Sequence, residues 1–296
     1  MNTQNPSNSG TSSCSEVFID RCIDRVNVMN SKVKPKKVTI KGSDGNLYPF
    51  LGKMEQRGDL KKDKRVMELC NLLNKLLRRN GESMQRKLDI LIKNFSKPRH
   101  ICNVYTLTEN HGLLEWVQNT VPMRNCIEQE HMHCKHNLLD PDTFAIHNMD
   151  YLTKLVPRHP PVLHLWYQRT SADPSDWLAR RNTYAKSLAV WSMLGYILGL
   201  GDRHGENILI DKVSGSIVHV DFDCLFGRGL HLAKPEVVPF RLTANCVTPL
   251  GVTGVEGLYR HSCEVFMKVI QNNRDTLSAV LGSFVADPFV DWKNKV

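Results

Sequence analysis

The chain has 296 residues, of which 41% are hydrophobic and 23% are charged, a composition that is ordinary for a globular protein. Its longest apolar run, residues 188–200, is broken by one serine and two glycines, which excludes a membrane span and predicts a buried helix. The formal net charge of +9 favours attraction to polyanions such as nucleotide phosphates, acidic substrates or nucleic acid, with solvated basic faces as the alternative.

The start of the chain predicts a disordered tail followed by a β-hairpin. Residues 1–13 are rich in serine, asparagine and threonine and lack the features of a signal peptide. The nine cysteines show no disulfide-framework spacing, so we expect free thiols in a reducing intracellular compartment. Val38 and Ile40 alternate with polar residues, residues 43–46 supply the turn, and an apolar run resumes at residues 47–51.

The remainder of the first half predicts one main helix and two short strands. Apolar residues recur with helical spacing from Val66 to Leu77, and Asn80-Gly81 can end that helix. Strand-like runs follow at residues 100–107 and 112–117. The first half is therefore expected to be a small, strand-rich lobe.

The second half is predicted to be mostly helical. Asp173-Pro-Ser-Asp176 is a helix-start signal, and the helical pattern that follows continues to Leu198. Its buried face can use Trp177, Tyr184, Leu188, Trp191 and Leu194. A loop is expected over residues 226–248, and two further helices over residues 255–270 and 274–285.

A polar segment, GLGDRHGENILIDKVSGSIVHVDFD at residues 199–223, follows the long helix. Its two apolar runs, residues 208–210 and 217–220, are joined by turn residues and predict a second hairpin. This hairpin is expected to bring Asp221 beside Asn207, with Asp202 close by.

Such an arrangement suits phosphoryl transfer from ATP. Mg²⁺ takes oxygen ligands from one or two side chains and from the substrate phosphates, which Asn207 and Asp221 could supply. A further carboxylate, here Asp202, can orient a hydroxyl nucleophile and accept its proton. Turn residues without a catalytic role are the alternative.

The motif Asp202-Arg203-His204 with Asn207, followed by Val220-Asp221-Phe222, resembles the signature of the phosphatidylinositol-kinase-related protein kinases and their lipid-kinase relatives. The similarity extends from about residue 15 to the end of the chain and is greatest to the ATR checkpoint-kinase branch of that family. The segments that carry this similarity are Lys34–Lys37, Gly42–Gly45, Asp59–Asp63, Arg65–Met67, Gly112–Val117, Pro157–Pro161, Gly195–Leu209 and Val238–Thr243.

The resemblance implies an α+β, bilobal, protein-kinase-like fold. A small β-rich N-lobe with the hinge is expected over residues 14–117, and a larger, mainly helical C-lobe over residues 118–296. Within the C-lobe the resemblance implies a catalytic loop at residues 199–209 and an activation loop at residues 221–243. The loop that covers the phosphates corresponds to residues 29–36, which contain no glycine and so depart from the usual glycine-rich cradle.

The resemblance also implies which residues bind ATP. Lys53 matches the lysine that contacts the phosphates, and Asp63 matches the acidic residue of the same pocket. Trp116 and Val117 match the hinge that holds adenine. A surface lysine, a helix cap and a core tryptophan are the respective alternatives for Lys53, Asp63 and Trp116.

Catalysis and metal binding are assigned to four residues of the polar segment by the same resemblance. Asp202 corresponds to the catalytic base, and His204 to a residue that stabilises charge on the transferred phosphoryl group. Asn207 and Asp221 correspond to the ligands of Mg²⁺, for which Mn²⁺ can substitute. Arg203 is expected to be structural and to pair with a carboxylate.

A histidine-rich segment, Glu130–His136, also contains one cysteine. We interpret it as a polar surface segment, because no second pair of ligands stands at the spacing of a zinc finger; a zinc site is the alternative.

The resemblance implies a nuclear, ATP- and Mg²⁺-dependent serine/threonine protein kinase that phosphorylates Ser or Thr followed by Gln. The implied partners are DNA-damage checkpoint proteins and an ATR-interacting regulatory subunit, with any DNA contact indirect. A phosphoinositide kinase is one alternative, although Arg228, Lys234 and Arg241 are widely spaced in the activation loop. A truncated, non-catalytic nucleotide-binding fragment is a second alternative, since the FATC segment that the resemblance implies does not follow residues 291–296. Whether this chain is active on its own stays open.

Overall fold

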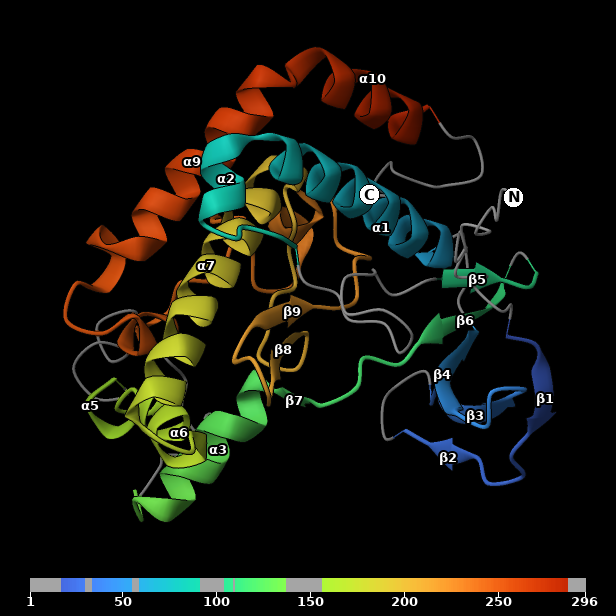
Figure 1. Ribbon diagram of the computed structural model, residues 1–296, viewed down its shortest axis with the longest axis horizontal. Coiled ribbons are helices and arrows are strands. Elements are labelled where there is room, and N and C mark those ends of the chain that lie inside the picture. The colour runs from blue at the N-terminus through green and yellow to red at the C-terminus, as the bar shows by residue number, and fades with distance from the viewer. Residues whose placement is uncertain are drawn as a thin grey trace, which may run out of the picture.

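The structure is a computed structural model that describes residues 17–29, 34–54, 59–90, 104–108, 110–136 and 156–286. A strand-rich part occupies one end of the molecule, and helices make up most of the remainder (Figure 1). The tail predicted at residues 1–13 lies outside the described residues, as do residues 30–33 of the loop expected to cover the phosphates.

The N-terminal part is built on a six-stranded antiparallel sheet with the order β1-β3-β4-β6-β5, in which β2 also pairs with β3. Its strands are β1 (Ile19–Cys22), β2 (Asn27–Val28), β3 (Lys36–Gly42), β4 (Leu47–Met54), β5 (Val104–Thr106) and β6 (His111–Glu115). The predicted first hairpin is confirmed as β3–β4, with Ile40 opposite Tyr48. Gly45 has a φ of 80°, the left-handed conformation that the turn requires and that glycine adopts without strain.

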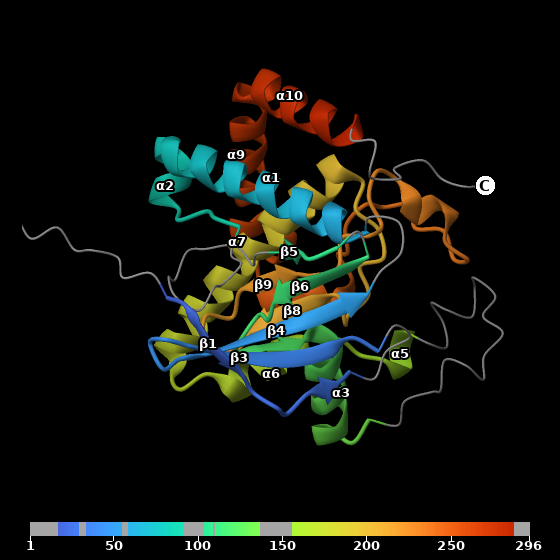
Figure 2. The ribbon, with the colours of Figure 1, turned by 90° about the vertical axis from the view of Figure 1, so that its right-hand side faces the viewer.

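The main helix of this part, α1 (Asp59–Arg79), starts one to two turns earlier than the predicted apolar pattern. Figure 2 looks onto the sheet, with α1 lying above it. The prediction that Asn80-Gly81 ends the helix holds only in part, because a second short helix, α2 (Gly81–Gln85), begins there. Asn80 is its N-cap, and its side-chain oxygen accepts the N–H of Ser83 at 3.0 Å.

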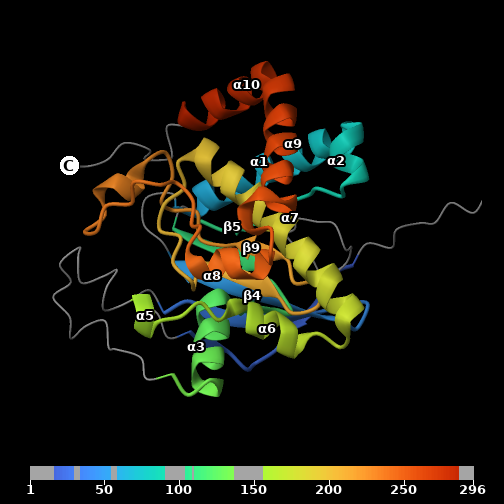
Figure 3. The same cartoon turned by 90° about the vertical axis from the view of Figure 1, so that its left-hand side faces the viewer.

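The C-terminal part is mostly helical, as predicted. Its α-helices are α3 (Met123–His133), α5 (Val156–Arg158), α6 (Leu163–Thr170), α7 (Pro174–Leu198), α8 (Ala244–Val247), α9 (Leu258–Asn272) and α10 (Arg274–Val285). The 3₁₀ turns are η3 (Arg228–His231), η4 (Thr248–Leu250) and η5 (Gly254–Glu256). Figure 3 shows the long α7 crossing this part, with α9 packed against it. Among the described residues no helix is long and apolar enough to cross a membrane.

Helix α7 begins and ends at the residues that its sequence predicts. Asp173 is the N-cap, and its carboxylate accepts the N–H of Asp176 at 2.8 Å, with Pro174 in the first turn. Gly199 ends the helix with a φ of 54°. This glycine turns the chain directly into the polar segment, so the end of α7 fixes where that segment starts.

A three-stranded antiparallel sheet, in the order β7-β8-β9, supports the polar segment. Its strands are β7 (Thr120–Pro122), β8 (Ile208–Asp211) and β9 (Ile217–His219). The hairpin predicted over residues 208–220 is therefore confirmed, and Ile208 lies opposite His219. Strand β7, which the sequence did not indicate, pairs with the other edge of β8.

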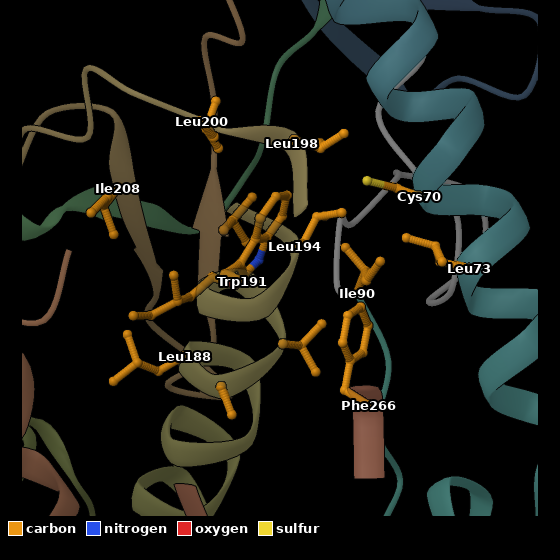
Figure 4. Packing of buried hydrophobic residues seen from close by; sticks show 14 of the residues in the cluster. Cys70, Leu73, Ile90, Leu188, Trp191, Leu194, Leu198, Leu200, Ile208 and Phe266 are labelled. Carbon is orange, nitrogen blue, oxygen red and sulfur yellow. The ribbon is translucent and has the colours of Figure 1, made fainter. Parts of the chain in front are cut away.

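The core that holds this small sheet is centred on Trp191 of α7 (Figure 4). Its indole stacks on His219 at a centroid distance of 4.6 Å and lies 5.9 Å from the ring of Phe222. The indole N–H also donates to the carbonyl of Ile217 at 3.1 Å. These contacts fix β9, and the residues just after it, against the longest helix of the molecule.

Candidate active site

The polar loop after α7 holds Asp202 in an unusual backbone conformation. Asp202 has a φ of 56°, which few residues other than glycine adopt. The side-chain amide of Asn207 donates to the carbonyl of Asp202 at 3.0 Å, and Asn207 is itself 8% exposed. The Asp202 carboxylate stays half exposed and lies 3.9 Å from Nε2 of His204. The loop therefore presents an accessible carboxylate beside a histidine.

The hairpin brings the two predicted metal ligands to the same end of β8 and β9. The N–H of Val220 donates to the carbonyl of Asn207 at 3.1 Å, which continues the β8–β9 pairing by one step. Asp221 is the residue after Val220; it is exposed and has a φ of 64°. The backbones of Asn207 and Asp221 thus lie at the same end of the hairpin.

Arg203 links this hairpin end to the loop, but not as the sequence suggested. It was expected to pair with a carboxylate; instead its guanidinium donates to the backbone carbonyls of Gly201 at 2.9 Å, Val220 at 2.8 Å, and Asp221. Burial lowers the pKa of Arg203 from its ordinary value, and the carboxylates of Asp221 and Asp202 oppose that shift. A planar donor fork is suited to binding several carbonyl oxygens at once, so Arg203 fixes the backbone that carries Asp202 and Asp221.

Replacing Arg203 by methionine should lower the free energy of unfolding by about 3 kcal/mol, because buried carbonyl oxygens lose their donors. Urea denaturation followed by circular dichroism measures this change. Arg260→Met is the matched control, since Arg260 is exposed and pairs with Glu256 and Glu264 on the surface. Equal unfolding midpoints for the two variants would contradict the role given to Arg203.

Helix α1 contacts the segment that follows β9. Asp63 is buried, and its carboxylate accepts the N–H of Phe222 at 2.9 Å. Asp63 lies in the second turn of α1 rather than at its start, so the alternative of a helix cap does not apply. The contact joins the strand-rich part to the residue next to Asp221.

A second contact from α1 involves residues that sequence reasoning missed. Lys62 is buried, and its ammonium lies 3.2 Å from the carboxylate of Asp223. Arg228 pairs with the same carboxylate at 3.0 Å. Asp223 follows Asp221-Phe222 at the position of the glycine in the Asp-Phe-Gly motif of ordinary protein kinases, and this departure from the motif was the signal in the sequence. The acidic residue at that position gives α1 an ionic contact with the following loop.

Lys53 lies on β4, on the sheet face that α1 covers. It is opposite Gly112 of β6, and a Cβ built on Gly112 would lie 3.0 Å from the side chain of Leu60 in α1. Lys37 lies opposite Leu51, which alternation places on the same face as Lys53. The structure thus puts two lysines on the inner face of the sheet.

Trp116 and Val117 connect β6 to β7 and therefore join the two parts of the molecule. The N–H of Trp116 donates to the carbonyl of Pro49 at 3.1 Å, and the ammonium of Lys37 lies 4.2 Å from the centre of its ring. Val117 is buried, and its carbonyl accepts the hydroxyl of Thr120 at 3.0 Å. Both residues have the connecting position that was predicted for a hinge.

The histidine-rich segment is only partly the surface segment that was predicted. Helix α3 turns Glu130 and His131 inward, where both are buried, and Glu130 pairs with Arg169 at 3.1 Å. Nδ1 of His131 lies 3.0 Å from Nδ1 of His136. Among the described residues no group of three or more His, Cys, Asp or Glu side chains is placed to hold a metal ion.

The segment expected to be the activation loop borders a pocket of about 330 Å³ next to the polar loop. The pocket is lined by Leu200, Arg203, Glu236, Val237, Val238, Phe240, Arg241, Leu242 and Thr243. Val237 and Val238 are largely exposed. This loop therefore lies beside the residues that carry Asp202.

Comparison with known proteins identifies the family of this chain. The sequence profile of the family described as phosphatidylinositol 3- and 4-kinase matches residues 49–294. The chain is 43% identical to protein kinase rad3 of Schizosaccharomyces pombe over 92% of its own length and 11% of that protein. It is 42% identical to the serine/threonine-protein kinase ATR of Arabidopsis thaliana, covering 91% of this chain and 10% of the relative.

Solved structures give the same result for the fold. The structure titled "FAT and kinase domain of CtTel1" superposes with a TM-score of 0.84 at 28% identity and covers 99% of this chain and 21% of the other. The predicted α+β kinase-like fold is thereby confirmed. The chain spans about a tenth of the length of the curated relatives named above.

Proposed function

This chain belongs to the phosphatidylinositol 3- and 4-kinase family, and from this premise we propose that it carries the catalytic region of a serine/threonine protein kinase of the ATR, Rad3 and Mec1 group. The observation that carries the proposal is the meeting of Asp202, Asn207 and Asp221 around the hydrogen bonds of Arg203. The reaction is transfer of the terminal phosphoryl group of ATP to a serine or threonine hydroxyl.

The donor set around the hairpin end fits a hard divalent cation. The amide nitrogen of Asn207 is bound to the carbonyl of Asp202, so its amide oxygen is the atom that can ligate a cation. Asp221 adds an exposed carboxylate oxygen, and Mg²⁺ accepts one or two such protein ligands. When bound, the cation supplies positive charge that neutralises the phosphates. Mn²⁺ suits the same oxygen ligands.

In this proposal the nucleotide is bound by four residues that lie in the N-terminal part and in the connection from β6 to β7. Lys53 provides a positive charge for the phosphates from a strand, where its backbone is fixed by pairing with Gly112. Asp63, whose carboxylate holds the backbone of Phe222, is assigned to the same nucleotide site. Trp116 and Val117 form the hinge, and they present an aromatic ring and backbone groups to the adenine.

Asp202 is the catalytic base. It accepts the proton of the substrate hydroxyl while that oxygen attacks the phosphorus, so the alkoxide need not form in advance. His204, half exposed and 3.9 Å from the Asp202 carboxylate, stabilises charge on the transferred group. The half exposure of both side chains leaves room for a protein substrate to reach them.

The proposal includes the substrate and the cellular setting that the sequence resemblance implies. The substrate is Ser or Thr followed by Gln in DNA-damage checkpoint proteins, the partner is an ATR-interacting regulatory subunit, and the site of action is the nucleus. Any contact with DNA is made through partners.

Radiolabelled ATP, offered with a Ser-Gln peptide, its Ser-Ala counterpart and phosphoinositide vesicles, tests the proposal. We expect label in the Ser-Gln peptide at least about tenfold above the Ser-Ala peptide, a ratio within reach of one specific pocket contact. The assay should compare this chain with a longer chain extended at both ends. Label in the vesicles and in neither peptide identifies a lipid kinase instead, and ATP binding without any transfer identifies a non-catalytic module.

A further inference from the structure

A carboxylate of the activation loop reaches the backbone of Asp202. Oε2 of Glu236 accepts the N–H of Asp202 at 2.6 Å, although the two residues are 34 positions apart in the sequence. The N–H of Glu236 in turn donates to the carbonyl of Gly229 at 2.9 Å, so the backbone of Glu236 is itself held. Contacts between a charged acceptor and a backbone N–H are among the stronger hydrogen bonds in proteins.

Two glycines leave the space that this contact requires. A Cβ at Gly201 would lie 3.0 Å from Oε2 of Glu236 and 2.8 Å from Sγ of Cys224. A Cβ at Gly229 would lie 3.2 Å from the same carboxylate oxygen. Side chains at either position would therefore push the Glu236 carboxylate away from the loop.

The contact acts on a residue with left-handed backbone. This conformation costs energy for residues other than glycine, less for aspartate and asparagine than for most, and contacts with the surroundings stabilise it at Asp202. Two hydrogen bonds give that support, one from the Asn207 amide to the Asp202 carbonyl and one from the Asp202 N–H to Glu236. Only the second comes from outside the loop that carries Asp202.

We propose that Glu236 is a positioning residue for Asp202. It holds the loop in the conformation that presents the Asp202 carboxylate to the substrate, and so it links the conformation of the activation loop to proton transfer. The inference rests on the function proposed above for Asp202. Glu236 also borders the pocket of about 330 Å³, so a direct role in substrate binding is the competing explanation that the test must separate.

The test compares the variants Glu236→Ala and Glu236→Gln with the parent chain. Glu236→Ala removes the acceptor. We expect its kcat for the Ser-Gln peptide to fall about 100-fold, the loss typical of a displaced catalytic group. The KM for ATP and the KM for the peptide should each stay within about twofold of the parent value. Glu236→Gln keeps an acceptor oxygen, so its kcat should recover to within about fivefold of the parent value. Glu256→Ala, which removes an exposed glutamate paired with Arg260, is the matched control and should equal the parent.

Hydrogen exchange at the Asp202 amide provides a readout that needs no activity. In Glu236→Ala this amide should exchange at least about tenfold faster than in the parent, whereas Glu236→Gln and Glu256→Ala should keep its protection. If the parent chain transfers no phosphate, the proposed function fails, and the exchange rates still decide the role of Glu236.

Three results would overturn the inference. Unchanged kcat and exchange in Glu236→Ala would show that the contact does not hold Asp202. A loss in Glu236→Gln as large as in Glu236→Ala would show that an acceptor oxygen does not suffice. A rise in peptide KM with unchanged kcat would assign Glu236 to substrate binding.

Discussion

We expect the Asp202→Asn variant to transfer phosphate to a Ser-Gln peptide about 1,000-fold more slowly than the parent chain, a loss within the range for a general base. Asparagine has the size of aspartate but cannot accept the proton of the attacking hydroxyl. It also tolerates the left-handed backbone at this position. The two hydrogen bonds that hold Asp202 use its backbone, so the variant keeps both.

Single-turnover transfer and thermal unfolding should be measured on the same preparation of Asp202→Asn. The melting temperature and the ATP affinity are expected to match the parent, because the change leaves packing and nucleotide contacts intact. Asp173→Asn is a suitable control: Asp173 caps α7 far from the site along the chain, and asparagine caps helices equally well. Normal transfer by Asp202→Asn would remove Asp202 from the role of base.

Elements whose signals are local were predictable from the sequence. Helix α7 begins at the N-cap Asp173 and ends at Gly199, and both residues act through neighbours within one turn. The two hairpins, over residues 36–54 and 208–219, follow from alternating apolar residues around turn residues. The family signature lies within a few residues of the second hairpin, so the meeting of Asn207 and Asp221 could also be predicted.

The early start of α1 could not be predicted from apolar spacing. Its first turns contain Lys62 and Asp63, which an amphipathic pattern assigns to the exposed face. Both are buried, because each contacts the segment after β9, which is about 160 residues away. Charged residues become compatible with burial only when the fold supplies a partner, and no window of the sequence contains that partner.

The same reason explains the incorrect expectation for Arg203 and the missed contact of Glu236. Sequence reasoning pairs a buried arginine with a carboxylate, whereas this one is bound by backbone carbonyls, which every residue carries and no pattern marks. Glu236 accepts a backbone N–H, and no sequence pattern marks that partner either. Short elements such as β7, with Pro122 at its end, also lack a run long enough to predict.

Loss of the predicted metal ligand should differ from loss of the base in its dependence on the cation. Asp221→Asn is expected to slow transfer about 1,000-fold at ordinary Mg²⁺ concentrations, since a bound cation supplies several kcal/mol of transition-state stabilisation. An amide is a weaker ligand than a carboxylate but still offers oxygen. Raising Mg²⁺ or replacing it by Mn²⁺ should therefore restore part of the activity in Asp221→Asn and none in Asp202→Asn.

The control for this experiment is Asp223→Asn. Asp223 lies two residues further along and is engaged by Lys62 and Arg228 rather than placed at the hairpin end. Its replacement should weaken the contact with α1 and reduce transfer less than about tenfold, by an amount that does not change with the cation. The carbonyl of Asp221 still accepts from Arg203 in both variants, so the backbone of the site is preserved. If Asp221→Asn and Asp223→Asn respond alike to added cation, the ligand role given to Asp221 is wrong. Only the replacement of a cation ligand makes the loss of activity depend on the cation concentration.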